Sequence, residues 1–390
     1  MPWREVSTMQ QRREFIELAV QEGSNRRELC RRFGVHPSTA YKWLARWQGG
    51  DREFVDRSRR PCTSPSRSAP AIEQAVLAVR DANPAWGARK IVRCLEREGI
   101  EAPARSTVHE ILRRHDRVRP PPGSPRALQR FEKPAPNLLW QMDFKGHVGL
   151  ADGSRCHPLT VLDDHSRYDL CLQACADEQG RTVQDRLERT FRCYGLPEAF
   201  FVDNGGPWGD SSGQRWTRFG VWLLKLGVAV LHSRPYHPQS RGKNERFHRT
   251  LNDEVFALKR FRNLAEVQRA FDAWRLTYNH ERPHEALGQE TPASRYQPSA
   301  RAMPDRLPEV EYDERETVRT VPASKDYISF KGRLWKVPQA FRGERLAIRP
   351  LTSDGRYGVF FAAHQIGSID LTKPQSVGDV SGHVSAMSPG

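Results

Sequence analysis

Three acidic residues in the second half of the chain have the types and surroundings that metal-dependent phosphate chemistry requires. Asp143 lies inside the apolar segment LWQMDF, Asp203 ends the apolar segment AFFVD, and Glu245 lies among basic residues in RGKNERFHR. Carboxylate oxygens contributed by separate elements suit Mg²⁺ or Mn²⁺, and a basic rim suits a phosphodiester. Two such ions can activate a water or a 3′-hydroxyl and stabilise the departing oxygen in an in-line displacement.

Each of these acids also has a structural explanation. Asp143 fits a buried, hydrogen-bonded residue, Asp203 a turn residue before Asn204-Gly205, and Glu245 a partner in ion pairs at helical spacing. Two further acids, Asp163 and Asp164, are explained by a hairpin turn and are not expected to bind metal.

Alternating strands and helices are expected to position the three acids. Three successive strands are predicted over LWQMDFKGHV and CHPLTVLDDHSRYDLCLQAC, the last two forming a hairpin. Then follow a helix in RTVQDRLERTFRCYG, a buried strand in AFFVDN, a helix in RWTRFGVWLLKLG, a strand in VAVLH and a long helix that begins near Glu245. This order predicts an α/β core over residues 137–300, with a mixed sheet covered by helices.

Residues 9–48 are predicted to form a helix-turn-helix unit that binds DNA. Apolar residues recur at helical spacing, Gly34 makes a tight turn, and Pro37 suits the first position of a third helix. That helix is expected to enter the major groove. The residues expected to contact phosphates or base edges are Ser38, Thr39, Tyr41, Lys42 and Arg46. The alternative is a small helical bundle with a solvated basic surface.

Residues 71–117 repeat the same pattern and predict a second helix-turn-helix unit. Its expected DNA contacts are Arg105, Ser106, Thr107 and His109. Residues 49–70 are a basic linker in which Arg59 and Arg60 are expected to follow a DNA groove, with a flexible tether as the alternative. Residues 118–136 form a second, Pro-rich linker.

The composition supports a nucleic-acid partner and excludes several other classes of protein. The 390 residues include 62 Lys and Arg and 47 Asp and Glu, a net charge of +15, of which residues 1–130 carry +11. The mean hydropathy is −0.72, and the chain has neither a run of about 18 apolar residues nor an apolar segment at its start. We therefore expect no membrane association and a cytoplasmic location. Seven scattered cysteines are consistent with reduced thiols.

The segments around the three acids resemble one known family, the DDE-type insertion-sequence transposases with a retroviral-integrase-like catalytic core. They are WQMDFKG, FVDNGGPW and HSRPYHPQSRGKNERFHRTL, supported by LTVLDDHSRY and YNHERPHEALGQETPASRY, and the resemblance covers residues 10–300. It implies a ribonuclease H-like core in which Asp143, Asp203 and Glu245 bind two Mg²⁺ ions, with Mn²⁺ as a possible substitute. The reaction that it implies is DNA strand cleavage and transfer at transposon ends. It also implies that the partner is double-stranded DNA, both the transposon ends and the target DNA, and that the protein is bacterial and associated with the nucleoid. Joining two ends calls for more than one active site, so we also expect a homo-oligomer on DNA.

The interval between Asp203 and Glu245, 41 residues, is longer than in related integrases. We assign the excess to a surface insertion in PWGDSSGQRW. The next glutamate, Glu254, has a less fitting context. Near Glu245, Arg241 is expected to approach the DNA backbone and Lys243 to hold a phosphate, each with a structural role as the alternative.

The remaining residues are predicted to form a small β-barrel over 317–371 and a disordered tail over 372–390. Two other functions share much of this pattern. One is a phage- or retroelement-type integrase with the same chemistry, and the other is a DNA-binding regulator without catalysis.

Overall fold

A computed structural model describes residues 7–56, 67–118, 132–209, 216–232, 242–372 and 377–380. The chain divides into two compact units, Met1–Arg67 and Ser68–Gly390. Among the described residues, no helix is long and apolar enough to cross a membrane.

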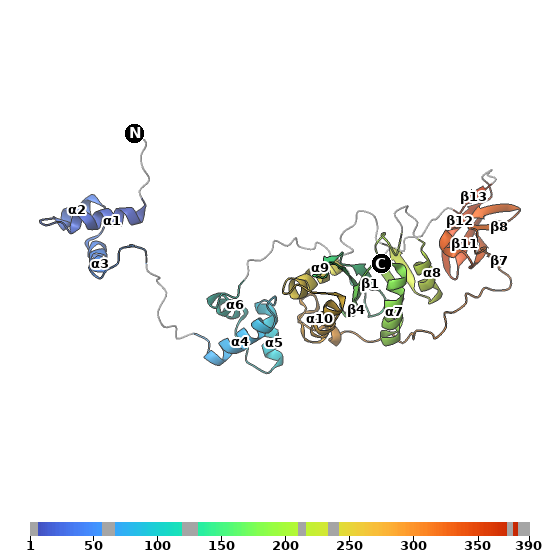
Figure 1. Ribbon diagram of the computed structural model, residues 1–390, viewed down its shortest axis with the longest axis horizontal. Coiled ribbons are helices and arrows are strands. Elements are labelled where there is room, and N and C mark those ends of the chain that lie inside the picture. The colour runs from blue at the N-terminus through green and yellow to red at the C-terminus, as the bar shows by residue number, and fades with distance from the viewer. Residues whose placement is uncertain are drawn as a thin grey trace, which may run out of the picture. The chain divides into compact units, whose positions relative to one another are not determined.

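The first unit contains three helices, α1 (Thr8–Ala19), α2 (Arg26–Arg32) and α3 (Pro37–Gln48) (Figure 1). Pro37 occupies the start of α3 as predicted, because its fixed φ suits a position whose N–H needs no partner within the helix. The core includes Phe15, Ile16, Trp43 and Leu44. The expected helix-turn-helix order is therefore present.

The second unit begins with three more helices, α4 (Pro70–Ala82), α5 (Ala88–Arg97) and α6 (Arg105–Arg114). The helices α3 and α6 bury equivalent positions at a constant offset of 68 residues. These pairs are Ala40 and Val108, Trp43 and Ile111, and Leu44 and Leu112. The repeat inferred from the sequence thus extends to the packing of the third helix.

A mixed six-stranded sheet follows, as the sequence predicted. Its strands are β1 (Trp140–Phe144), β2 (Val148–Gly149), β3 (Arg155–Asp163), β4 (Asp169–Cys175), β5 (Ala199–Val202) and β6 (Ala229–His232). The strand β3 pairs antiparallel with β1, β2 and β4, whereas β1, β5 and β6 are parallel. The parallel strands lie in the order β1-β5-β6.

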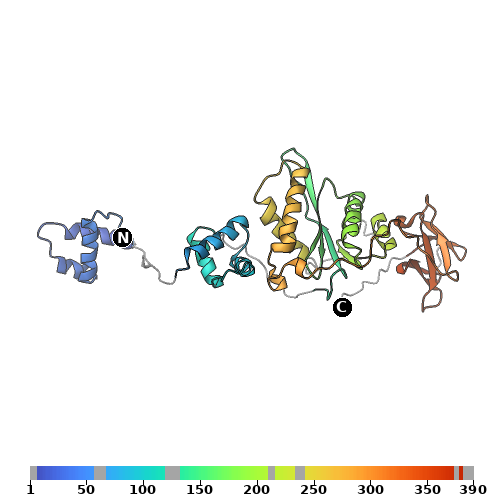
Figure 2. The same ribbon diagram turned by 90° about the horizontal axis from the view of Figure 1, so that it is seen from below.

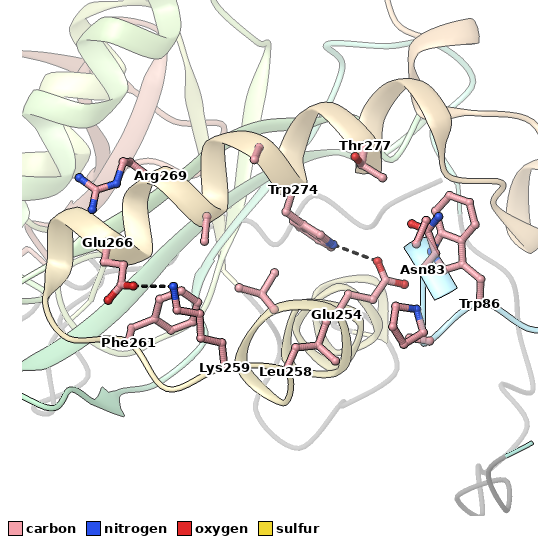
Figure 3. A pocket seen from close by; sticks show the side chains of 16 residues that line it. Asn83, Trp86, Glu254, Leu258, Lys259, Phe261, Glu266, Arg269, Trp274 and Thr277 are labelled. Atoms are coloured by element: carbon pink, nitrogen blue, oxygen red, sulfur yellow. Dashed lines mark hydrogen bonds and ion pairs between the residues drawn. The ribbon is translucent and has the colours of Figure 1, made fainter. Parts of the chain in front are cut away.

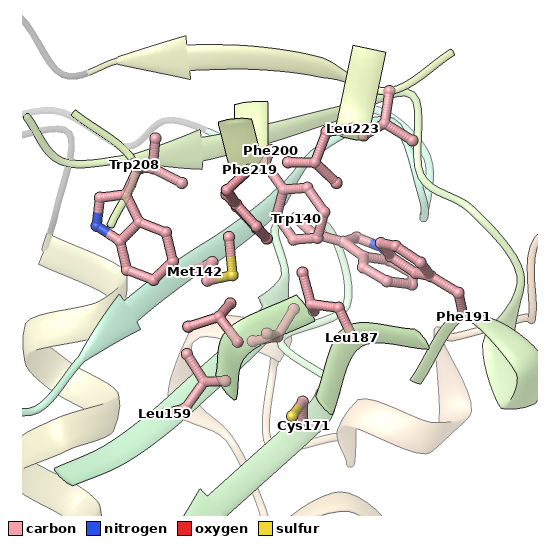
Figure 4. Close-up of a cluster of buried hydrophobic side chains, with 14 of the residues drawn as sticks. Trp140, Met142, Leu159, Cys171, Leu187, Phe191, Phe200, Trp208, Phe219 and Leu223 are labelled. Atoms are coloured by element: carbon pink, nitrogen blue, oxygen red, sulfur yellow. The ribbon is translucent and has the colours of Figure 1, made fainter. Parts of the chain in front are cut away.

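Helices cover both faces of this sheet (Figures 1 and 2). On one face lie α7 (Gly180–Tyr194) and α8 (Arg218–Lys225), whose apolar side chains join Trp140, Met142 and Phe200 of the sheet (Figure 4). On the other lie α9 (Gly242–Leu251) and α10 (Leu264–Leu276), which pack Phe247 and Phe271 on the sheet. Shorter helical segments follow α9 and α10, at η2 (Asn252–Phe256), η3 (Thr277–Glu281), η4 (Glu285–Leu287) and η5 (Pro292–Ser294).

The C-terminal part contains two sheets around a shared apolar core. One pairs β7 (Thr317–Thr320), β10 (Arg345–Pro350), β11 (Arg356–Phe361) and β12 (His364–Asp370), and the other β8 (Tyr327–Phe330), β9 (Arg333–Lys336) and β13 (Val377–Asp379). The predicted β-barrel is not confirmed, because both sheets are open over the residues that the structure describes. Alternation fixes which side chains face the core, but it does not specify whether edge strands pair and close a barrel.

The predicted disordered tail differs from the structure at one segment. Residues 377–379 form β13, which pairs in parallel with β9. Most of the rest of 372–390 lies outside the described residues.

Candidate active site

Asp143 and Asp203 lie at the ends of neighbouring parallel strands. In the register of β1 and β5, Trp140 pairs with Phe200 and Gln141 with Phe201. Continuing this register by two residues places Asp143 opposite Asp203, on strands about 4.8 Å apart. Ligand-contacting residues of such sheets collect at these carboxyl ends.

The alternation of side chains places both acids on the α9 side of the sheet. Met142 and Val202 belong to the core under α7 and α8. Because successive residues of a strand point to opposite faces, the next residues, Asp143 and Asp203, point to the other face. Glu245 lies in the first turn of α9 on that same side of the sheet. Asp143 and Asp203 are half-buried, and Glu245 is exposed.

The loop after β5 is held close to β1. One carboxylate oxygen of Asp203 accepts a hydrogen bond from the Gly205 N–H at 2.9 Å, and the Asp203 carbonyl lies 2.9 Å from His232 Nδ1. The buried Trp208 ring stacks on Phe144, with 5.7 Å between the ring centroids. Asp203 therefore has the turn role suggested by the sequence, and the loop that it opens is anchored beside the strand that carries Asp143.

The helix α9 is connected to Asp143 through Thr160 and His248. Thr160, opposite Asp143 in the β1–β3 pair, donates its hydroxyl to the Asp143 carbonyl at 3.0 Å. The same oxygen lies 2.9 Å from His248 Nε2. Burial, followed by the charge of Lys145, lowers the pKa of His248 to about 4, so the ring is neutral near pH 7. The single hydroxyl proton is already donated, so His248 must carry its proton on Nε2.

Lys243, one residue into α9, pairs with the buried Asp164. Its Nζ lies 2.5 Å from Asp164 Oδ1. Asp164 also accepts hydrogen bonds from Gln141 Nε2 and the Lys133 N–H, both at 2.7 Å. Burial and then the charge of Arg167 lower the pKa of Lys243 to about 8. The structure thus assigns Lys243 an internal partner, the structural alternative that the sequence left open.

Asp163 and Asp164 have structural partners in the predicted hairpin, which is present. Asp163 accepts hydrogen bonds from the Asn137 N–H at 2.8 Å and from the Ser166 N–H at 2.7 Å. Both acids are 1% exposed. They tie the β3–β4 turn to the segment before β1.

Glu254 is likewise held in a structural role. Its two carboxylate oxygens accept hydrogen bonds from Trp274 Nε1 and Arg282 Nε, each at 2.9 Å. Figure 3 shows Glu254 pointing at the Trp274 ring in a pocket of about 590 Å³ that also involves Trp86. The lining of this pocket includes none of the three candidate acids. Glu245 therefore remains the better candidate of the two glutamates.

The donor set fits a hard divalent cation only in part. The neighbouring carboxylates of Asp143 and Asp203 are oxygen ligands of the kind that Mg²⁺ takes. Within the described ranges, however, no group of three His, Cys, Asp or Glu side chains is arranged to hold a metal. Residues 233–241, which precede α9 and include the predicted DNA contact Arg241, lie outside those ranges.

Four of the five candidate DNA contacts of the first unit are exposed on α3. These are Ser38, Thr39, Tyr41 and Lys42. Arg46 differs, because its Nε donates to Asp51 at 2.8 Å and its guanidinium lies 4.2 Å from the centroid of the Trp43 ring. Arg46 thus has partners inside its own unit.

The second unit shows a similar surface at the start of α6. Arg105, Ser106 and His109 are exposed, and Thr107 is half-buried. The linker residues Arg59 and Arg60 lie outside the described residues.

Thr160, Lys145 and His248 were not identified as site residues from the sequence. Lys145 follows the end of β1, is half-buried and lies close enough to His248 to lower its pKa. His248 lies one helical turn after Glu245, a spacing that could have indicated a shared helix face. Thr160 gave no such signal, since its importance depends on a pairing 88 residues away in the chain.

Five segments of the chain match known protein families. Residues 133–238 and 226–292 match two families described as integrase core domain, and residues 316–377 match the IS481 family transposase C-terminal domain. Residues 11–61 match a helix-turn-helix domain and residues 39–112 a homeodomain-like domain. These matches confirm the resemblance to insertion-sequence transposases. Along the chain, the helix-turn-helix and homeodomain-like matches precede the integrase core matches.

Two curated relatives come from insertion elements. The Insertion element IS407 uncharacterized 31.7 kDa protein of Burkholderia multivorans is 30% identical over 159 residues, which are 41% of this chain and 55% of the relative. The Insertion element IS476 uncharacterized 39.2 kDa protein of Xanthomonas euvesicatoria is 29% identical over 158 residues, 40% of this chain and 44% of the relative. The chain spans about half the length of these relatives.

The solved structures with a similar backbone fold include retroviral proteins. A chain of the simian T-cell lymphotropic virus intasome, in complex with PP2A regulatory subunit B56 gamma, has 18% identity and a TM-score of 0.36, covering 77% of this chain and all of that one. The HTLV-2 integrase catalytic core domain in complex with magnesium, in its trimeric form, has 16% identity and a TM-score of 0.32, covering 42% of this chain and 99% of that one.

Proposed function

We propose that the protein is a DNA transposase that binds transposon terminal repeats and catalyses metal-dependent DNA strand cleavage and strand transfer. The observation that carries the proposal is the parallel register of β1 and β5. Extended by two residues, this register sets Asp143 opposite Asp203, on the side of the sheet where α9 carries Glu245. The matches to integrase core and transposase families support the same reaction class.

In this proposal, Asp143, Asp203 and Glu245 would hold two Mg²⁺ ions, with Mn²⁺ able to substitute. The ions would supply Lewis-acid stabilisation of the attacking and leaving oxygens of a phosphodiester. Glu245 would complete the set at the exposed start of α9, where DNA can approach.

The proposed organisation follows the sequence. It assigns helix-turn-helix units to 9–48 and 71–117, linkers to 49–70 and 118–136, a ribonuclease H-like core to 137–300 and a β-rich domain to 317–371. The exposed starts of α3 and α6 would bind the terminal repeats, with double-stranded DNA also bound as the target. Because cutting and joining involve two ends, the acting form would be a homo-oligomer on DNA.

A strand-transfer assay tests the proposal. The full chain is incubated with Mg²⁺ and DNA that carries the element's terminal repeats, and cleaved and joined products are resolved on a gel. We expect Asp143→Asn to reduce the yield of both products by a factor on the order of 10³, because it removes a carboxylate that would hold the catalytic metal ions. The matched control is Asp152→Asn, which changes an exposed acid in the turn before β3. Full activity of Asp143→Asn would refute the proposal.

Two alternatives are separated by simple observations. A phage- or retroelement-type integrase would share the chemistry, but the coding region would lack flanking terminal repeats. A DNA-binding regulator would bind a specific sequence and show no Mg²⁺-dependent nicking.

A further inference from the structure

The contact between Thr160 and His248 crosses from the sheet to the helix that carries Glu245. We propose that Thr160 and His248 are positioning residues that fix α9, and with it Glu245, relative to Asp143. This inference rests on the proposed function, in which Glu245 and Asp143 bind the same pair of ions.

The two hydrogen bonds that connect His248, Thr160 and Asp143 run in one direction, and the central residue, Thr160, is buried. Thr160 is 0% exposed, and its one hydroxyl proton is donated to the Asp143 carbonyl at 3.0 Å. The same oxygen then accepts from His248 Nε2 at 2.9 Å. A continuous path of two hydrogen bonds therefore runs from α9 to the backbone of Asp143 itself.

The position of His248 makes this link relevant to Glu245. Both residues belong to α9, three residues apart, which is about 4.5 Å along a helix axis. A helix segment of this length moves as a unit, so a displacement of His248 is passed on to Glu245. The helix α9 also packs on the sheet through apolar side chains, among them Phe247 and Leu251. Apolar contacts tolerate rotation of a helix about its axis, whereas a hydrogen bond restricts it.

A second polar attachment lies on the other side of Glu245. Lys243 pairs with Asp164 at 2.5 Å, and Asp164 in turn accepts from Gln141 of β1. The helix is thus tied to β1 both two residues before and three residues after Glu245. Two attachments fix the helix along its axis as well as in rotation.

Such positioning affects metal affinity because ligand oxygens must meet the ion within narrow distance limits. Substitution of outer residues that orient ligands typically costs about 10- to 100-fold in metal affinity or activity. The Thr160–His248 link is of this kind, since it orients two ligand-bearing elements without itself supplying a ligand.

The test compares three threonine variants of the full chain. Thr160→Val removes the link with little change in volume, and Thr160→Ser keeps the hydroxyl. Thr250→Val is the matched control, because the Thr250 hydroxyl bonds to Arg246 O within the same helix. Mn²⁺ binding is titrated by electron paramagnetic resonance of the free ion, and amide hydrogen exchange in α9 is followed by mass spectrometry.

We expect Thr160→Val to weaken Mn²⁺ binding by about tenfold or more and to speed exchange in α9. The Mn²⁺ affinity of Thr160→Ser should stay within about twofold of that of the unsubstituted protein, because the hydroxyl is kept. This change is small beside the roughly 10- to 100-fold effect of losing an orienting group. Thr250→Val should leave Mn²⁺ binding unchanged. His248→Leu breaks the same link from the helix side and provides the result if Thr160→Val is too unstable to titrate.

Two outcomes distinguish the failure of this inference from the failure of the proposed function. If Asp143→Asn and Glu245→Gln abolish Mn²⁺ binding while Thr160→Val and His248→Leu bind as Thr250→Val does, the positioning role is wrong. If Asp143→Asn and Glu245→Gln also bind Mn²⁺ normally, the proposed function is overturned, and the inference with it.

Discussion

Asp169 gives the sharpest prediction about stability, because it is an acid with no exposed surface. It lies at the start of β4, 0% exposed. Its backbone N–H donates to Asn279 Oδ1 at 2.8 Å, and its carbonyl accepts from Asn279 Nδ2 at 3.0 Å. Burial raises the pKa of the Asp169 carboxyl to about 7, against the opposing effects of the Arg275 guanidinium and the Cys171 N–H. The folded protein therefore holds Asp169 protonated in mildly acidic solution.

The sign and size of the effect follow from linkage. Below the ordinary pKa of 3.8, Asp169 is protonated in both the folded and the unfolded state, and there is no penalty. Between that value and about 7, only the unfolded state loses the proton, so the free energy of unfolding falls as the pH rises. At about 1.4 kcal/mol per pKa unit, the full penalty is about 4 kcal/mol, and the part that develops between pH 5 and pH 8 is about 3 kcal/mol.

The perturbation is Asp169→Asn, which removes the titrating group and keeps its shape. Urea denaturation at pH 5 and pH 8, followed by tryptophan fluorescence, gives the free energy of unfolding of both proteins. We expect the variant to gain about 3 kcal/mol relative to the unsubstituted chain between the two pH values. Asp185→Asn, an exposed acid on α7, controls for the loss of a carboxylate. The reasoning is refuted if Asp169→Asn shows the same pH dependence as the unsubstituted protein.

Two further predictions concern the basic residues. Lys42→Ala should weaken binding of terminal-repeat DNA and lower the slope of log affinity against log salt concentration by about one. Arg46→Ala should mainly lower the melting temperature, because Arg46 pairs with Asp51. Equal effects of the two variants on this slope, measured by fluorescence anisotropy, would contradict this. Reversing Glu285 and Glu290 to Arg replaces ion pairs with Arg89 and Arg93 of α5 by like-charge contacts, and should speed amide exchange in α5. Unchanged exchange would show that these pairs do not hold the helix.

Much of the core was predictable from local pattern. The segments around Asp143 and Asp203 have the apolar runs of buried strands, and both form strands that end at or next to the acid. The third helix of each helix-turn-helix unit was marked by its apolar spacing, and in the first unit also by Pro37 at its start. These features depend on residues a few positions apart, where sequence spacing translates directly into geometry.

The contacts that refine the site could not be predicted in the same way. The hydroxyl of Thr160 meets His248 across 88 residues of sequence, and Lys243 meets Asp164 across 79. A threonine in a strand or a lysine at the start of a helix has no local mark that names such a partner. The β-barrel prediction has the same weakness, since closure is decided by pairing between edges and not by alternation within strands.

The basic excess also has a different meaning once its partners are known. Several arginines of the first 130 residues are engaged inside the chain, with Asp56, Asp51, Glu285, Glu290 and Glu73 as partners of Arg12, Arg46, Arg89, Arg93 and Arg114. A guanidinium already paired with a carboxylate releases few counterions from DNA, so net charge overstates the surface available to phosphates. The exposed residues at the starts of α3 and α6 are few and largely uncharged. Specific recognition is therefore expected to depend on Tyr41 and His109, which occupy equivalent positions of the two helices, more than on the total charge.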